Sequence, residues 1–350
     1  MALNGLSSRQ RVLNLFNGQK VDRMPVFSGM GNITVYGLRQ HGLRFAEVHT
    51  DARKMATAAA STYRLFGFEC AVVPFDMGVE AEILGCTVNY YDDGSERILY
   101  PTMSEKPAEK VEDLQLKIPQ NLAQAGRIPV VTEAIGRLKE DVGQEVAIGS
   151  WVLGPFTLAG QILDLNALLK TSYKKPDLVN GVLDSLASYL IDILHIYKQA
   201  GADYLTVREM GATSDVINPR MFKALVLPHL QRIFAAIPSP KVLHICGNTN
   251  PIVELMAEAG ADALAVEQKN DLAATVQKVG DRQLVFGNLD PYGVLVQGTP
   301  EIVRQTVKQI IDHGADAVWP GCDIWPEAPV ENMRALVEEV KRSGTRDLIS

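Results

Sequence analysis

Long apolar runs are missing from this sequence. No window approaches ~18 consecutive apolar residues, the length that a transmembrane helix needs, so we expect no membrane span. The first residues, MALNGLSSRQRVLNLFNG, also lack the basic-then-apolar layout of a signal peptide. These two absences together predict a cytoplasmic protein.

Positive charge and cysteine are both scarce. The 34 Lys and Arg residues are outnumbered by 41 Asp and Glu, which gives a net charge of −7 at pH 7. An acidic chain of this kind lacks the positive charge that binds a phosphate backbone, so we expect no nucleic-acid binding. Its 4 cysteines are too few for a disulfide framework. A clustered pair of cysteines would therefore point to metal ligation or catalysis.

What the sequence does contain is an alternation of short β-rich runs with longer helical patterns, which favours parallel strands joined by crossover helices. We predict strands at residues 24–29, 70–75, 145–152, 204–209, 241–246, 263–268, 283–288 and 317–322. Eight such units predict one α/β domain over residues 1–350, a single (β/α)8 TIM barrel. Residues 1–22 read as an N-terminal helical extension. Residues 77–140 read as an insertion or lid after the second strand.

A weak internal repeat supports the barrel. The tripeptide Gly-Ala-Asp occurs at residues 201–203, 260–262 and 314–316, each time after a helical pattern and before a strand. A glycine at a helix C-terminus takes the left-handed conformation that ends the helix. The repeat thus places three helix-to-strand loops, two units apart.

The run KVLHICGNTNP, residues 241–251, ends an apolar strand in a histidine and a cysteine, directly before a turn-like segment. Residues i and i+2 of a strand point to the same face. His244 and Cys246 therefore project together, while Ile245 faces the helix layer. They lie at the carboxyl end of their strand, where barrel active sites are built. Taken alone, a buried histidine or cysteine is more often part of the core.

A third residue of the same chemistry falls on the same rim. Cys322, in WPGCDIWPEAP, ends the eighth predicted strand, which a barrel brings near the fifth and sixth across its mouth. Imidazole and two thiolates are good zinc ligands, and three protein ligands leave a position open for substrate. Glu267, in LAVEQK, is a candidate fourth and weaker ligand. The alternative for Glu267 is an ion pair with Lys269 or a rim arginine.

Further polar residues lie at or just beyond predicted strand ends and are candidates to line the pocket: Asp76, Glu80, Glu209, Asp215 and Asn288. We expect Asp215 and Asn288 to be the candidate cofactor-binding residues, although each of the five is more typical of a loop-capping group. The remaining cysteines, Cys70 and Cys86, read as ordinary buried thiols. We expect Trp319 and Trp325, which flank Cys322, to pack beneath the site.

With these residues in hand, the sequence resembles the uroporphyrinogen decarboxylase superfamily, and within it the cobalamin-dependent methyltransferases that act on coenzyme M. The resemblance runs over essentially the whole length, through RVLNLFNGQKVDRMPV, AEILGCTVN, LHICGNTNPI, VFGNLDP and PGCDIWPEAPVENMRALVE. The metal signature of that branch is His-x-Cys followed about 75 residues later by Cys, which His244, Cys246 and Cys322 match. A glutamate that completes the resting zinc shell of the branch maps onto Glu267.

The resemblance implies a zinc-dependent transfer of a methyl group from a methylcobamide to a thiol such as coenzyme M. The methylcobamide would arrive on a separate corrinoid protein and would not be tightly bound. We expect the thiol to displace Glu267 from the zinc, because carboxylate oxygen is a harder ligand than thiolate and zinc is borderline-soft, and we expect the freed carboxylate to accept the thiol proton. The decarboxylase branch is resembled less well. Its arginine-rich first loop corresponds here to FSGMGNITVYG, and its late Gly-His-Gly segment to PGCDIWP.

Several functions stay open at this point. The same fold and zinc site could serve another acceptor, such as tetrahydrofolate, or could demethylate a substrate onto the corrinoid. Decarboxylation of uroporphyrinogen, which needs no zinc, is a further alternative. A zinc-stabilised barrel that only binds a partner is another. The sequence does not choose the oligomeric state.

Overall fold

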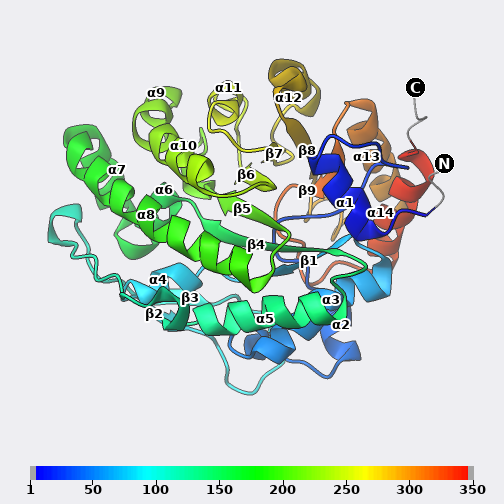
Figure 1. Ribbon diagram of the computed structural model, residues 1–350, viewed down its shortest axis with the longest axis horizontal. Helices are drawn as coiled ribbons and strands as arrows, with labels where there is room; N and C mark the ends of the chain where they lie inside the picture. The colour runs from blue at the N-terminus through cyan, green and yellow to red at the C-terminus, as the bar shows by residue number, and fades with distance from the viewer. Residues whose placement is uncertain (1–4, 346–350) are drawn as a thin grey trace.

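The strands form one curled parallel sheet inside a ring of helices (Figure 1). In this computed structural model, which describes residues 5–345, the sheet has seven strands in the order β1-β4-β5-β6-β7-β8-β9. They are β1 (Cys70–Val73), β4 (Ala147–Leu153), β5 (Tyr204–Arg208), β6 (Lys241–Ile245), β7 (Ala263–Val266), β8 (Leu284–Leu289) and β9 (Ala317–Pro320). Seven of the eight predicted strands are therefore present, in the predicted order.

The first predicted strand, residues 24–29, lies in the remaining barrel position without forming a regular strand. Val26 makes a parallel bridge to Val318 in β9, and its carbonyl accepts from the N–H of Glu69, just before β1. On the β1 side, however, the N–H of Val26 donates to the Glu69 carboxylate and that of Ser28 to the Cys70 sulfur. Side chains accept the N–H groups that would otherwise donate to a neighbouring strand. The segment therefore closes the barrel without forming a regular β-ladder.

Helices cover the outer face of the sheet. They are α1 (Ser8–Phe16), α2 (Val35–Gln40), α3 (Ala52–Phe66), α4 (Val79–Ile83), α5 (Ile128–Asp141), α6 (Pro155–Ile162), α7 (Leu165–Lys174), α8 (Pro176–Ala200), α9 (Pro219–Met221), α10 (Leu227–Ala236), α11 (Val253–Ala257), α12 (Leu272–Val279), α13 (Pro300–Asp312) and α14 (Val330–Ser343), with a π-helical turn at Phe222–Val226. The predicted extension thus contains α1; residues 1–4 of it lie outside the described part.

One helix, α8, is long and apolar enough to cross a membrane by length and composition, although we expected no such span. Its 25 residues connect β4 to β5 and contact α5, α6 and α10. Of its most apolar window, 44% is buried inside the protein. Its buried residues form the face that packs on the barrel and on the neighbouring helices.

The Gly-Ala-Asp repeat joins neighbouring strands at the amino-terminal end of the barrel. Its glycines adopt positive φ, 116° at Gly201 for example, as predicted for helix ends. Each aspartate accepts the backbone N–H of a residue at the start of the preceding strand: Ile148 donates to Asp203, Lys241 to Asp262 and Val285 to Asp316, at 3.0, 2.9 and 2.9 Å. The repeat therefore sets the spacing of three strand pairs.

Aromatic rings fill the barrel below the mouth. Phe27 lies 5.0 Å from Trp319 and 5.8 Å from Tyr204, measured between ring centroids. Phe286 stacks on Trp319 at 5.2 Å, and Phe16 of α1 closes the far end of this cluster against Phe27 and Phe286. Trp319 is fully buried, as predicted for a packing residue. The interior is a packed core, so chemistry is confined to the open end.

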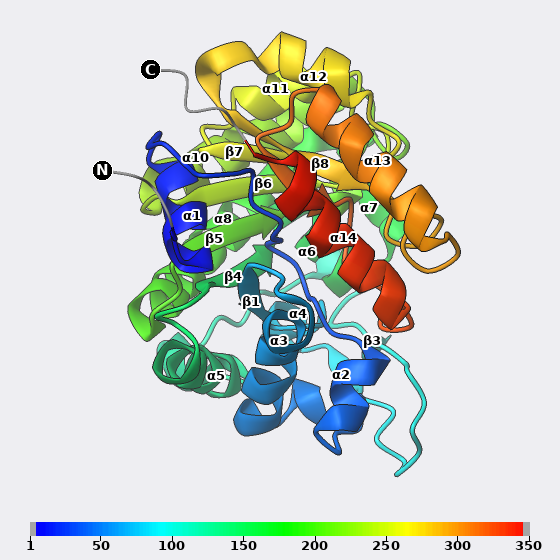
Figure 2. The same cartoon turned by 90° about the vertical axis from the view of Figure 1, so that its right-hand side faces the viewer.

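Residues 77–140 hold α4, the short antiparallel pair β2 (Thr87–Asn89) and β3 (Thr102–Glu105), and α5. The last of these contacts α3, β1 and β4, and so occupies the position of a barrel helix. The irregular part of this segment therefore ends where α5 begins, and it is shorter than the insertion that we expected over residues 77–140. The cyan chain around β3 runs along the edge of the molecule near α2 (Figure 2), where Arg44 forms an ion pair with Asp92.

Candidate metal centre

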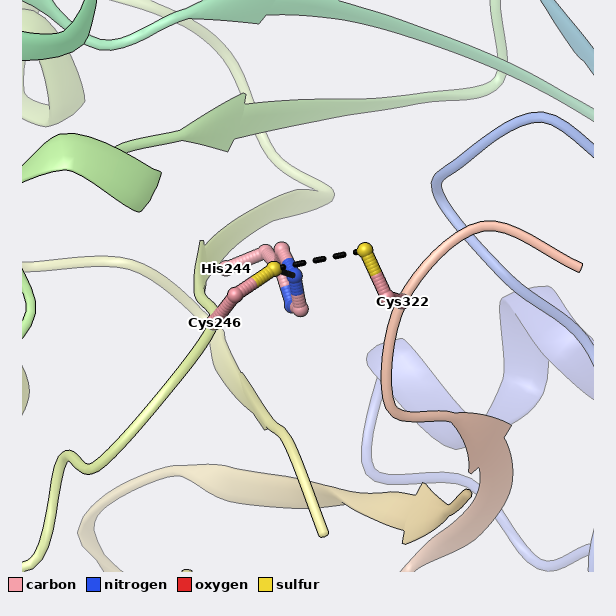
Figure 3. A group of neighbouring side chains, drawn as sticks. All are labelled: His244, Cys246 and Cys322. Atoms are coloured by element: carbon pink, nitrogen blue, oxygen red, sulfur yellow. Dashed lines mark hydrogen bonds between the residues drawn. The ribbon is translucent and has the colours of Figure 1, made fainter. Parts of the chain in front are cut away.

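Three side chains from two segments point at one another at the carboxyl end of the sheet (Figure 3). His244 lies in β6, Cys246 directly after it, and Cys322 two residues beyond the end of β9. The His244 Nε2 atom is 2.9 Å from the Cys246 sulfur, which is 3.4 Å from the Cys322 sulfur. All three ligand atoms lie within 4.8 Å of one another. The structure thus brings together the three residues with the strongest sequence signal.

Two glycines let the backbone reach this arrangement. Gly247 has φ +78°, and a Cβ there would lie 2.6 Å from the Thr213 hydroxyl oxygen. A Cβ on Gly321 would lie 3.1 Å from the Glu267 Cα. The positive φ and the short contact at Gly247 require glycine, and a backbone contact of 3.1 Å is tight enough to favour glycine at position 321 as well. One glycine follows Cys246 and the other precedes Cys322, which fixes how the two thiols face each other.

The spacing of the three side chains fits a tetrahedral zinc ion. With Zn–S bonds of about 2.3 Å and Zn–N bonds of about 2.0–2.1 Å, two sulfurs lie about 3.8 Å apart and a nitrogen and a sulfur about 3.6 Å apart. The observed separations are 3.4 and 2.9 Å. A shift of well under 1 Å in side chains would therefore accommodate the ion. Two soft sulfurs and an imidazole are also the donor set that zinc prefers.

The two thiols are hydrogen-bonded to each other, and either sulfur can be the donor. This bond is the main cause that holds the pKa of Cys322 well below its ordinary value. Burial opposes the shift, while His244 and the guanidinium of Arg208 add to it. The pKa of Cys246 is correspondingly raised. A cation is therefore favoured beside Cys322.

Glu267 lies directly after β7, beside the cluster but outside the group of three ligand atoms. Its carboxylate accepts the backbone N–H of Gly247, next to Cys246. The alternative ion pair with Lys269 is not formed, because Lys269 pairs with Asp215 at 3.5 Å. Asn288 donates its amide to the backbone carbonyls of Glu267 and Asn270 at 3.2 and 3.0 Å. Asn288 thus holds the loop that carries Glu267.

Among the other predicted pocket residues, Asp215 is a loop-capping group, since it accepts the N–H of Asn248 at 3.2 Å. Asp76 accepts from both terminal nitrogens of Arg127, at 2.7 and 2.9 Å, and contacts His49. Burial raises the pKa of Asp76, but Arg127 and His49 outweigh burial and hold it far below its usual range. Both residues therefore shape the barrel mouth through contacts with protein groups.

Two glutamates that we considered for the pocket are fully buried away from solvent. Glu209 accepts from the N–H and hydroxyl of Thr157 and from the N–H of Phe156. Neither oxygen of Glu80 has a hydrogen-bond partner within the described residues. Burial is the main cause that raises the pKa of each carboxyl to about 7. Glu209 therefore holds the start of α6, and neither glutamate belongs to the group of three candidate ligands.

A cavity of about 240 Å³ opens beside the cluster. It is lined by Phe75, Asp76, Met77, Tyr100, Pro101, Arg208, Cys322, Asp323 and Trp325. Trp325 is 46% exposed and lies 5.1 Å from the Tyr292 ring, so our expectation that it packs beneath the site was wrong. The sequence analysis missed Arg208, the last residue of β5. An arginine at the carboxyl end of a predicted barrel strand was the signal that could have identified it.

Comparison with known proteins places this site in a family. Residues 7–343 match the uroporphyrinogen decarboxylase family. The chain belongs to this family. It is 34% identical over 330 residues to the methylcobamide:CoM methyltransferase MtaA of Methanosarcina barkeri, covering 94% of this chain and 96% of that protein. It is 30% identical over 336 residues to MtbA, a methylcobamide:CoM methyltransferase of Methanosarcina acetivorans, covering 95% and 97%.

A solved structure of a methyltransferase from Methanosarcina mazei superposes on the chain with a TM-score of 0.90. It shares 31% sequence identity, and the match covers 97% of this chain and 99% of that one. The predicted barrel fold and the resemblance to the methyltransferase branch are thereby confirmed. The same relatives confirm the predicted enzyme class, a methyltransferase.

The cavity differs from what the reaction that gives the family its name requires. A tetrapyrrole with eight carboxylates needs several cationic partners. Among the residues that line this cavity, Arg208 is the single cation, and it is already paired with Asp323. The cavity therefore suits a small ligand better than a polyanionic tetrapyrrole.

Proposed function

We propose that this protein is a zinc-dependent methyltransferase that moves a methyl group from a methylated corrinoid to a small thiol. The observation that carries the proposal is the convergence of His244, Cys246 and Cys322 within 4.8 Å at the barrel mouth. The cavity beside Cys322 gives a thiol access to this centre. Coenzyme M is the proposed acceptor, because two relatives that match nearly the whole chain carry that acceptor in their names.

The three residues would hold zinc and set its charge. A zinc ion, when bound, keeps a coordinated thiol deprotonated at neutral pH. Cys246 and Cys322 contribute two negative charges and His244 none, so the loaded centre is neutral before the thiol adds its own charge. The surplus negative charge keeps the substrate sulfur electron-rich. Histidines in place of the two cysteines would leave a more electrophilic centre and a less reactive sulfur.

The transfer itself balances without a further reagent. The sulfur of the thiolate forms a bond to the methyl carbon, and the carbon–cobalt bond breaks with its electron pair left on cobalt, which is reduced from Co(III) to Co(I). The corrinoid carries the hard chemistry, while the protein supplies position and electrostatics. A cavity of about 240 Å³ is far too small for a corrin ring. The methyl group must therefore be presented from outside the mouth, and we propose a corrinoid protein as the partner that presents it.

Glu267 is the proposed fourth ligand when no thiol is bound. Its carboxylate already reaches the backbone N–H of Gly247, adjacent to Cys246. Carboxylate oxygen is a harder donor than thiolate, and zinc is borderline-soft. An incoming thiolate would therefore be expected to take the place of Glu267, whose carboxylate would stay near the site through its bond to the Gly247 N–H.

A methyl-transfer assay with free methylcobalamin tests the proposal. Loss of the methyl group changes the absorbance of the corrinoid, and the methylated thiol can be measured by mass spectrometry. We expect transfer to coenzyme M, and loss of transfer in Cys322→Ala. Cys86→Ala is the matched control, because Cys86 is buried but distant from the cluster and should leave the rate unchanged. Transfer that persists in Cys322→Ala, or in zinc-free protein, would overturn the mechanism.

Assays with other substrates separate the alternatives. Tetrahydrofolate in place of thiols tests the other acceptor. Methylated thiols or amines together with cob(I)alamin test the reverse direction. Uroporphyrinogen tests decarboxylation, for which the cavity offers a single lining cation.

A further inference from the structure

Arg208 is the one cation in the wall of the cavity beside Cys322. It ends β5, and its backbone pairs in register with His244 of β6. Its side chain is 1% exposed, and its guanidinium carbon lies 4.3 Å from the centre of the Trp151 ring. Arg208 is thus held rigidly, at the same level of the barrel as the candidate metal ligands.

Only part of this guanidinium is used by protein groups. The two terminal nitrogens bind the Asp323 carboxylate, at 3.2 Å from Nη1 and 2.5 Å from Nη2. The Nε–H has no hydrogen-bond partner within residues 5–345, although it is buried. A buried N–H without a partner destabilises the state that holds it. A ligand that accepts a hydrogen bond from Nε would remove this destabilisation.

The other charges around the cavity are already balanced. Asp76, the second carboxylate in the wall, is bound by Arg127 and contacts His49. Asp323 is bound by Arg208 and also accepts the backbone N–H of Gly31 at 2.9 Å. The rest of the wall is apolar or aromatic. A second anion entering this cavity would therefore find Arg208 as its one cationic contact.

We propose that Arg208 is the anion-recognition residue of the thiol acceptor, so that the acceptor must carry a negatively charged group on a short chain. The inference rests on the proposed function, which places the thiol sulfur beside Cys322. The cavity wall includes both Cys322 and Arg208, so one small molecule can reach both. A volume of about 240 Å³ suits a small acceptor with a short linker between sulfur and anion. A sulfonate or carboxylate on such a linker accepts from Nε and shares the guanidinium with Asp323.

Three thiols that differ only in the charge of the tail test this selectivity. They are coenzyme M (the anionic 2-mercaptoethanesulfonate), the neutral 2-mercaptoethanol and the cationic cysteamine. Each has two carbons between its functional groups. With free methylcobalamin as donor, we expect kcat/KM to fall in that order. A hydrogen bond to a charged group contributes about 1.5–3 kcal/mol, so the anionic thiol should exceed the neutral one about tenfold to a hundredfold.

Variants at two positions move this preference in opposite directions. Arg208→Met should collapse the ratio of kcat/KM between anionic and neutral thiol toward one, and Arg208→Lys should restore part of it. Asp323→Asn removes the carboxylate that competes for Arg208, so it should keep or increase the ratio. A purely structural role of Arg208 predicts no change in the ratio, because damage to the site lowers both rates together. Thermal melting confirms that each variant is folded.

A binding measurement without any reaction separates this inference from the proposed function. Ethanesulfonate lacks the thiol, so its binding depends neither on zinc nor on methyl transfer. Calorimetry should detect it with the wild type and not with Arg208→Met. Equal binding to both proteins, or equal kcat/KM for the three thiols, overturns the role of Arg208 and leaves methyl transfer standing. Binding of ethanesulfonate without methylation of any thiol would instead retain the anion site and overturn the function.

Discussion

The sulfur atoms of Cys246 and Cys322 lie 3.4 Å apart although 76 positions separate them in the sequence. The two residues follow strands β6 and β9, between which β7 and β8 intervene in the sheet. Their contact therefore exists only because the sheet curls into a barrel. The contact also gives the first prediction.

Removing either thiol should strip the metal without unfolding the protein. The wild type should contain about one zinc per chain by elemental analysis, and Cys246→Ala or Cys322→Ala should contain almost none, since each variant loses one of the two thiolates, the ligands that suit zinc best. The fold should survive, because the barrel is filled by its own aromatic core. Circular dichroism and thermal melting check this. An unfolded Cys322→Ala, with Cys86→Ala intact, would show that the metal is structural.

Thiol binding should release protons at neutral pH. A free thiol has a pKa of about 8.5, while a metal takes the thiolate. Calorimetric titration with coenzyme M in buffers of different ionisation enthalpy should reveal a net release. Cys322→Ala, which lacks the metal, is the control and should show none. If Glu267 takes up the proton the release shrinks, and Glu267→Gln should then restore it. Absence of release in both proteins would argue against sulfur–metal coordination.

The coordination of the metal should change when thiol binds. X-ray absorption should find two sulfurs, one imidazole nitrogen and one oxygen without thiol, and three sulfurs with loss of the oxygen when thiol is present. Glu267→Gln should keep most of its zinc, because His244, Cys246 and Cys322 remain, yet it should transfer methyl groups more slowly. A metal shell that does not change in the presence of a thiol under turnover would remove Glu267 from this role.

Glu80 should make stability depend on pH. Burial is the main cause that raises the pKa of its carboxyl from 4.5 to about 7. The folded state thus keeps a proton that the unfolded state releases, so stability is full below about pH 4.5 and falls as pH rises through about 7. The free energy of unfolding at pH 8 is lower by roughly 3 kcal/mol than below about pH 4.5 on account of this one group.

Urea unfolding of wild type and Glu80→Gln across pH 4 to 8 measures this effect as a difference. Glutamine keeps the shape of the protonated acid and does not titrate. The variant should therefore gain stability relative to the wild type as pH rises. A parallel pair of profiles would mean that Glu80 titrates normally in the folded protein. Glu209, whose pKa is raised to about 7 in the same direction, remains in both proteins and cancels in the difference.

Local pattern was enough to predict much of this protein. The alternation of apolar runs and helical periodicity located seven strands and their order, because each strand is buried on both faces and reads as a continuous apolar run. The period-2 geometry of a strand predicted that His244 and Cys246 face the same way. Glycines at helix ends were predictable for a similar reason, since positive φ is open to few other residues.

Tertiary structure decided the rest. The segment at residues 24–29 carries a strand-like pattern, but the side chains of Glu69 and Cys70 compete for its N–H groups, which no local pattern reveals. Arg208 reads in sequence as one charged residue at a strand end. Its function depends on Asp323, Trp151 and Cys322, which lie far away along the chain. The chain by itself determined which residues can bind a metal, and only the closure of the barrel determined which charge stands beside them.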